Sequence, residues 1–159
     1  MIKRPSRWVT GSGEEVSADI VFKTLGEHTQ QGGKVFVGTD SQLKSDACIF
    51  ATAICLHGET GPHKGRYYFK RFRTEREPYA KLKVRIMEEV NHSIEIGMKI
   101  IECFPTADVE IHVDIGSTAK SKTRNLVTTM TRWAKGAGFS CKIKPDAWAS
   151  ASIADKHTK

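Results

Sequence analysis

The chain has 159 residues, 39% of them apolar and 27% charged, which is enough for one globular domain with a core and too short for two. Its formal net charge of +7 favours a polyanionic partner, because surplus lysine and arginine release counterions on binding. No apolar run has the length of a membrane span or a signal peptide, so we expect a soluble, cytoplasmic protein with no membrane partner. The four cysteines form no CxxC pair, which indicates reduced thiols rather than disulfides or a zinc site.

The first half of the chain predicts one helix followed by three strands. The helix is expected over 17–31, because Ser17 is a typical N-cap and a Gly pair follows the last residue. Its apolar stripe comprises Ile20, Val21 and Leu25. Strands are expected over 34–40, 47–56 and 66–73, since these runs are rich in β-branched or alternating aromatic residues.

Helices alternate with strands in the second half. A long amphipathic helix is predicted over 78–103, with proline in its first turn. Its apolar positions are Leu82, Ile86, Val90, Ile94 and Ile101. A strand over 109–114, a helix over 121–137, a strand over 139–143 and a last helix from 146 follow.

This order of elements predicts an α/β fold with a mixed sheet. Three successive strands favour an antiparallel meander, whereas strands separated by helices join as parallel crossovers. We therefore expect a five-stranded mixed sheet flanked by helices on both faces. The whole chain, 1–159, forms one domain in this interpretation, with 1–33 as an N-terminal helical extension and 34–159 as the core.

Four acidic residues are candidates for one carboxylate cluster: Asp40, Glu89, Asp114 and Asp155. Asp40 and Asp114 close predicted strands at the carboxyl end, where sites gather in α/β sheets. At 100° per residue, Glu89 falls on the sheet-facing flank of its helix and Glu88 on the opposite side. The alternatives are turn residues at 40 and 114, a Glu89 that reaches a surface lysine or arginine, and a solvated Asp155.

Several motifs carry a resemblance to a known family. VGTDSQ, RIMEE, HVDIGSTAKSKTR and KIKPDAWASASIADKHTK resemble the ribonuclease H-like fold and, more narrowly, the small bacterial YkuK-type ribonuclease H-like family. The match runs from about Val35 to the end of the chain. The resemblance implies a two-metal nuclease that uses two Mg²⁺ or Mn²⁺ ions.

The resemblance also assigns roles to the carboxylates. Asp40 would bridge both ions, and Asp155 would help to hold the ion that activates water. Glu89 and Asp114 would hold the second ion, next to the leaving 3′ oxygen. Mg²⁺ prefers such oxygen ligands. His157 is a candidate for proton transfer near the ions, with a solvated terminal histidine as the alternative.

A polar and basic segment after Asp114 is the candidate contact for a nucleic-acid backbone. With two residues from other segments, the predicted contacts are Ser41, Thr118, Lys120, Lys122, Thr123, Arg124 and Lys144. The alternative is a solvated charge cluster at the start of a helix.

Three functions remain open at this point. The favoured one is a metal-dependent nuclease acting on an RNA/DNA hybrid, structured RNA or branched DNA, among which the sequence does not distinguish; nor does it define the oligomeric state. A second is a nucleic-acid-binding module of the same fold with little or no catalysis. A third starts from DIGST at 114–118, which resembles the phosphate loop of sugar and acetate kinases, although the chain lacks their second domain.

Overall fold

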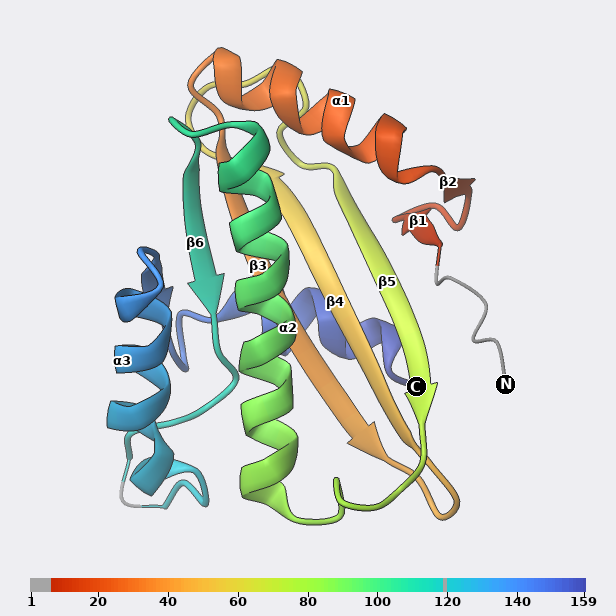
Figure 1. Ribbon diagram of the computed structural model, residues 1–159, viewed down its shortest axis with the longest axis vertical. Coiled ribbons are helices and arrows are strands. Elements are labelled where there is room, and N and C mark those ends of the chain that lie inside the picture. The colour runs from red at the N-terminus through yellow and green to blue at the C-terminus, as the bar shows by residue number, and fades with distance from the viewer. Residues whose placement is uncertain (1–6, 119) are drawn as a thin grey trace.

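A seven-stranded mixed sheet forms the centre of the computed structural model, which describes residues 7–118 and 120–159 (Figure 1). The spatial order is β2-β1-β5-β4-β3-β6-β7. The strands are β1 (Trp8–Thr10), β2 (Glu15–Val16), β3 (Lys34–Leu43), β4 (Cys48–His57), β5 (Tyr67–Thr74), β6 (Asp108–His112) and β7 (Ser140–Lys142). The predicted five-strand sheet was therefore wrong. A short N-terminal hairpin adds β1 and β2 beside β5, and strands of three and two residues are too short to show a period.

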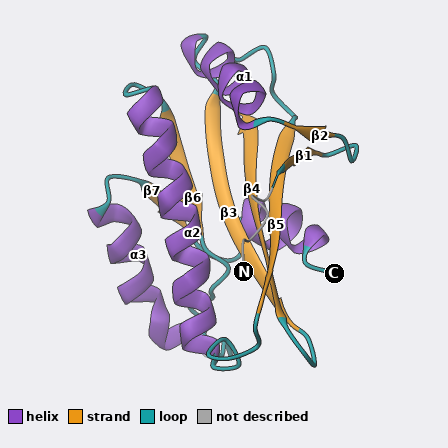
Figure 2. Cartoon of the chain, turned by 45° about the vertical axis from the view of Figure 1, so that its right-hand side comes forward, coloured by secondary structure: helices purple, strands orange, loops and turns teal. Residues whose placement is uncertain are grey.

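Helices cover both faces of the sheet, as predicted (Figure 2). They are α1 (Ala18–Gln30), α2 (Leu82–Cys103), η1 (Arg124–Leu126), α3 (Val127–Gly136), η2 (Ala149–Ile153) and η3 (Ala154–His157). Helices α2 and α3 lie on one face, η2 and η3 lie on the other, and α1 crosses one end of the sheet. None of the helices in the described ranges is long and apolar enough to cross a membrane.

The boundaries of several elements differ from the predicted ones. Ser17 caps α1 as expected, accepting a hydrogen bond from the Ile20 amide at 3.2 Å, but the Ile20 side chain is 51% exposed and lies outside the core. Helix α2 begins at Leu82 rather than at Pro78. The helix expected from 121 is a short 3₁₀ turn followed by α3, and the last helix is a π-helical turn followed by a 3₁₀ turn.

The predicted topology is confirmed. Strands β3, β4 and β5 form an antiparallel meander, β6 joins β3 in parallel, and β7 joins β6 in parallel. Gly38 opposite His112 is the last pair between β3 and β6. Beyond it, β3 continues to Leu43 with β4 on one side only. The end of β6 therefore leaves a notch along β3, and Asp40 lies on this open edge.

Alternate residues of β3 face two separate hydrophobic clusters. Val35 and Val37 belong to the larger cluster, which α1, α2 and α3 also supply. Gly38 faces η2 instead, where a Cβ atom would lie 2.6 Å from the carbonyl carbon of Ala149. The smaller cluster on that side contains Ala53, Cys55, Ala149 and Ala154, so small side chains let the C-terminal helices approach the sheet closely.

Candidate functional site

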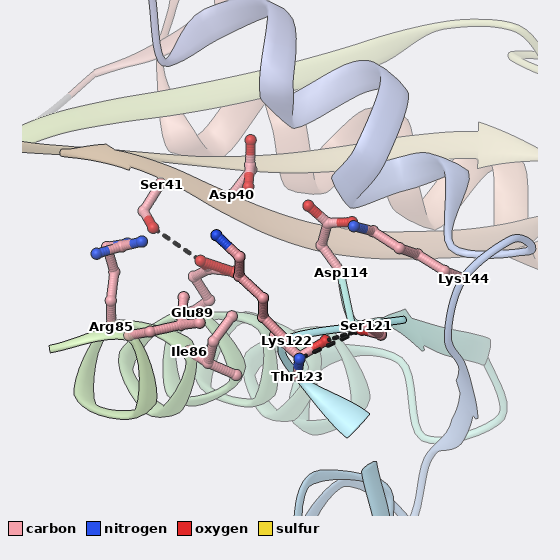
Figure 3. A pocket seen from close by; sticks show the side chains of 11 residues that line it. Asp40, Ser41, Arg85, Ile86, Glu89, Asp114, Ser121, Lys122, Thr123 and Lys144 are labelled. Carbon is pink, nitrogen blue, oxygen red and sulfur yellow. Dashed lines mark hydrogen bonds and ion pairs between the residues drawn. The ribbon is translucent and has the colours of Figure 1, made fainter. Parts of the chain in front are cut away.

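A pocket of about 380 Å³ opens at the notch beside β3 (Figure 3). It brings together three of the four predicted carboxylates with cationic and hydroxyl side chains from β3, from α2 and from the segments that follow β6 and β7. The lining residues are Asp40, Ser41, Leu82, Arg85, Ile86, Glu89, Asp114, Ser121, Lys122, Thr123 and Lys144.

Glu89 is a buried carboxylate on the sheet-facing side of α2, only 4% exposed. The Ser41 hydroxyl donates to its Oε2 at 2.7 Å, whereas Oε1 is buried without a hydrogen-bond partner. Burial, followed by the charge of Asp40, raises the pKa of Glu89 well above its usual value. No lysine or arginine in the described residues forms an ion pair with it. Its neighbour Glu88 lies 3.0 Å from His92 instead.

Asp40 is also buried, at 7% exposure. Burial, a side-chain hydrogen bond with Asp155 and the charge of Asp114 raise the pKa of Asp40 to about 8. A hydrogen bond between two carboxyl groups requires a proton on one of them. The structure thus brings Asp155 to Asp40, although Asp155 is not among the lining residues of the pocket and also lies 3.4 Å from the Lys159 ammonium.

Asp40 and Glu89 approach the notch from opposite faces of β3. Ser41 binds Glu89 on the α2 face, so the preceding residue, Asp40, points to the η3 face, where Asp155 lies. In the described part of the chain, no group of three or more His, Cys, Asp or Glu side chains is arranged to hold a metal ion. Convergence on one ion would require the side chains to rotate toward the open edge.

Asp114 follows β6 by two residues rather than ending it, and its carboxylate lies 3.3 Å from the Lys144 ammonium. Asp114 Oδ1 is buried and accepts no hydrogen bond, so the contact with Lys144 is an ion pair without hydrogen-bond geometry. The loop behind it is closed by the Thr123 hydroxyl, which accepts from the Gly116 amide at 2.9 Å and pairs with the Ser121 hydroxyl.

The remaining predicted contacts lie at different distances from the pocket. Lys122 and Lys144 line it together with Ser41 and Thr123, although the hydroxyls of these last two already bond within the protein. Thr118, Lys120 and Arg124 are exposed on the same loop, outside the lining. These contacts stay predictions.

His157 lies away from the pocket lining, over β5. Its ring stacks on Phe69 at 3.5 Å and its Nε2 lies 3.0 Å from the Tyr67 hydroxyl. Burial, followed by the charges of Lys156 and Arg71, lowers the pKa of His157. Its role in proton transfer stays a prediction.

Arg85 lines the pocket and was not predicted from the sequence. It lies one helical turn before Glu89, and its charge lowers the pKa of that carboxyl against the larger effect of burial. The spacing of four residues on one helix was the signal that would have found it.

The donor set fits a divalent cation by its chemistry. Two buried carboxylate oxygens, Glu89 Oε1 and Asp114 Oδ1, have no hydrogen-bond partner. Crowding and burial raise the pKa values of Asp40 and Glu89, as expected where negative charge is not fully neutralised. Mg²⁺ and Mn²⁺ take such oxygen ligands.

The mixed sheet with helices on both faces makes this an α/β protein, with carboxylates on the central strand β3, on α2 packed against it and after the parallel strand β6. A model of the family described as Ribonuclease H-like matches residues 15–159, and the chain belongs to that family. The resemblance to this family that the sequence motifs indicated is confirmed. Members of this family generally use divalent metal ions, and their fold suggests nucleic-acid binding.

One curated relative is similar over most of its length. The uncharacterized protein YkuK of Bacillus subtilis (strain 168) is 33% identical over 138 residues, covering 77% of each chain. No solved structure matches the chain significantly.

Proposed function

We propose that this protein is a metal-dependent nuclease that hydrolyses phosphodiester bonds of nucleic acid, either RNA in a hybrid or a structured nucleic acid. The observation that carries the proposal is the group of Asp40, Glu89 and Asp114 beside the open edge of β3, in which Asp40 and Glu89 are buried and Glu89 Oε1 has no hydrogen-bond partner. Each carboxylate comes from a different element, so the fold itself gathers them at this edge.

The proposed chemistry assigns each group a task. Two Mg²⁺ or Mn²⁺ ions would activate water and stabilise the leaving 3′ oxygen. Asp40 would contribute to holding both ions, Asp155 would help to hold the ion that activates water, and Glu89 and Asp114 would hold the other. Ser41 orients Glu89 through its hydrogen bond. Arg85 and Lys122, on the pocket wall, would bind the phosphates that flank the cleaved bond.

A second candidate is a nucleic-acid-binding module with little catalysis. Two observations favour it: the carboxylates come from opposite faces of β3 and form no ready-made metal cluster in the described residues. The kinase-like alternative gains no such support, since residues 114–118 follow a parallel strand and do not lie in a hairpin.

A cleavage assay on paired variants separates the two candidates. Wild type, Glu89→Gln and Glu88→Gln are incubated with labelled RNA/DNA hybrid, double-stranded RNA, single-stranded DNA and a branched junction, in Mg²⁺ or Mn²⁺. Glu88 is the matched control, because it precedes Glu89 on the same helix but contacts His92.

We expect wild type and Glu88→Gln to cleave at least one substrate, and Glu89→Gln to be slower by about 100-fold or more, since a metal ligand is lost. Binding without cleavage by all three proteins would support the binding module. Equal cleavage by wild type and Glu89→Gln would contradict the proposed site.

A further inference from the structure

Lys144 is held beside Asp114 by the backbone. Past the ends of β6 and β7, the Val113 amide donates to the Lys142 carbonyl and the Lys144 amide donates to the Ile115 carbonyl, both at 2.9 Å. The two segments therefore continue side by side beyond the sheet. Because of this pairing, Asp114 and Lys144 both lie at the notch, where the lysine side chain extends to the carboxylate (Figure 3).

The ion pair with Lys144 distinguishes Asp114 from the other two carboxylates of the pocket. Lys144 Nζ lies 3.3 Å from Asp114 Oδ1. Among residues 7–118 and 120–159, neither Asp40 nor Glu89 has an ion pair with a lysine or arginine, although Arg85 and Lys122 line the same pocket. Within the described residues, Lys144 thus supplies the one lysine or arginine charge that forms an ion pair with the three carboxylates lining the pocket.

A lysine ammonium and a divalent ion compete for one carboxylate oxygen at close range, because their charges repel. We propose that Lys144 is a tethered cation that occupies the place of one metal ion at Asp114, so that the free protein takes up one divalent ion fewer than its carboxylates could hold. The proposal rests on the proposed function, because it assumes that these carboxylates bind metal.

The lysine side chain is also suited to leave. It is 52% exposed, whereas the Asp114 side chain is 20% exposed, so the ammonium can turn toward solvent while the carboxylate stays in place. A phosphate group entering the notch would offer the ammonium another anionic partner. In this scheme, Asp114 would become available to hold an ion once Lys144 contacts the nucleic acid.

Mn²⁺ titration of the substrate-free protein tests this inference without measuring activity. Free Mn²⁺ is counted by its electron paramagnetic resonance signal for wild type, Lys144→Met and Lys142→Met. Lys142 is the matched control, because it is exposed on β7, two residues earlier, and does not line the pocket.

We expect Lys144→Met to bind one more Mn²⁺ than wild type and Lys142→Met do. If wild type binds an ion at the same place at higher Mn²⁺ concentration, its affinity there should be about five- to tenfold lower than that of Lys144→Met. Equal, non-zero stoichiometry in all three proteins would overturn the role of Lys144 and leave the proposed metal site standing. The absence of binding in all three would instead refute the metal site and, with it, both proposals. Circular dichroism checks the fold, and Lys144→Gln replaces Lys144→Met if the latter does not fold.

Discussion

The two faces of β3 differ in how they bury polar groups. On the α2 face, the Thr39 hydroxyl bonds to the hydroxyls of Thr52 at 2.9 Å and Ser93 at 2.7 Å, and Ser41 binds Glu89. On the η2 face, Gly38 lies against the backbone of Ala149 and Ser150 with no room for a side chain. The α2 face therefore pairs side-chain hydroxyls with one another and with Glu89, whereas the η2 face also brings backbone next to backbone at Gly38.

This difference shows how one strand can serve a site from both sides. Glu89 is carried by α2, a 22-residue helix anchored in the larger core. Asp155 is carried by η3, a four-residue turn beside the smaller cluster, whose four buried members all have small side chains. We infer that the position of Glu89 is fixed more firmly than that of Asp155. The contact between Asp155 and Asp40 then depends on the close packing of η2 at Gly38.

Breaking the close packing should have the largest effect. In Gly38→Val, the new side chain would displace the backbone of η2, so we expect a loss of about 3 kcal/mol or more in the free energy of unfolding. Urea denaturation followed by circular dichroism measures it. Gly136→Ala is the control, because its Cβ would meet nothing within 4 Å. A loss in Gly38→Val as small as that of the control would show that η2 is not tightly docked.

The second prediction concerns the pH dependence of the unfolding free energy, which should reflect the carboxyl pair of Asp40 and Asp155. Burial and the contact with Asp155 raise the pKa of Asp40 from 3.8 to about 8. Between these values the folded state binds more protons than the unfolded state, so stability should fall as the pH rises through that window. For the metal-free protein in EDTA, we expect a loss on the order of 3 kcal/mol between pH 5 and pH 8.

Two variants identify the source of this pH dependence. Asp40→Asn should make the curve of unfolding free energy against pH less steep, since it removes one of the two buried carboxyls with a raised pKa, the other being Glu89. Glu59→Gln, at an exposed carboxylate in the loop after β4, should leave the slope unchanged. Equal slopes for wild type and Asp40→Asn would show that Asp40 is not the group responsible.

Much of the fold could be predicted from the sequence, because in long segments the spacing of apolar residues indicates the element type and its buried face. The meander and the parallel strands β6 and β7 follow from the order of elements. The helical rotation of 100° per residue predicts that Glu89 faces the sheet, and Glu89 is buried on α2. The N-terminal hairpin was missed, since β1 and β2 have too few residues to show alternation. Strand β3 runs past Asp40 because β4 pairs with it beyond the point where β6 ends, and this depends on tertiary contacts.

The arrangement of the site was harder to predict than its members. The sequence indicates which carboxylates gather, but the face on which each lies depends on register, and a shift of one residue reverses it. The pairing of Lys144 with Asp114 depends on two backbone hydrogen bonds between segments about 30 residues apart in the chain. From the sequence alone, Lys144 was predicted only as a contact to nucleic acid.

The smallest predicted effect tests whether the hydroxyls of the α2 face act as a unit. Thr39→Val and Ser93→Ala should each cost about 1 kcal/mol, and their double variant should show a coupling energy of about 0.5–1.5 kcal/mol, because the two hydroxyls are in contact at 2.7 Å. Thr39→Val with Ser150→Ala is the control pair: Ser150 bonds to the Ala147 carbonyl on the other face of β3, so the two losses should add. Urea denaturation of all five variants measures both cycles. Coupling of similar size in both would mean that the faces are not energetically separate, and that removing a polar contact behind Glu89 also disturbs the side that holds Asp155.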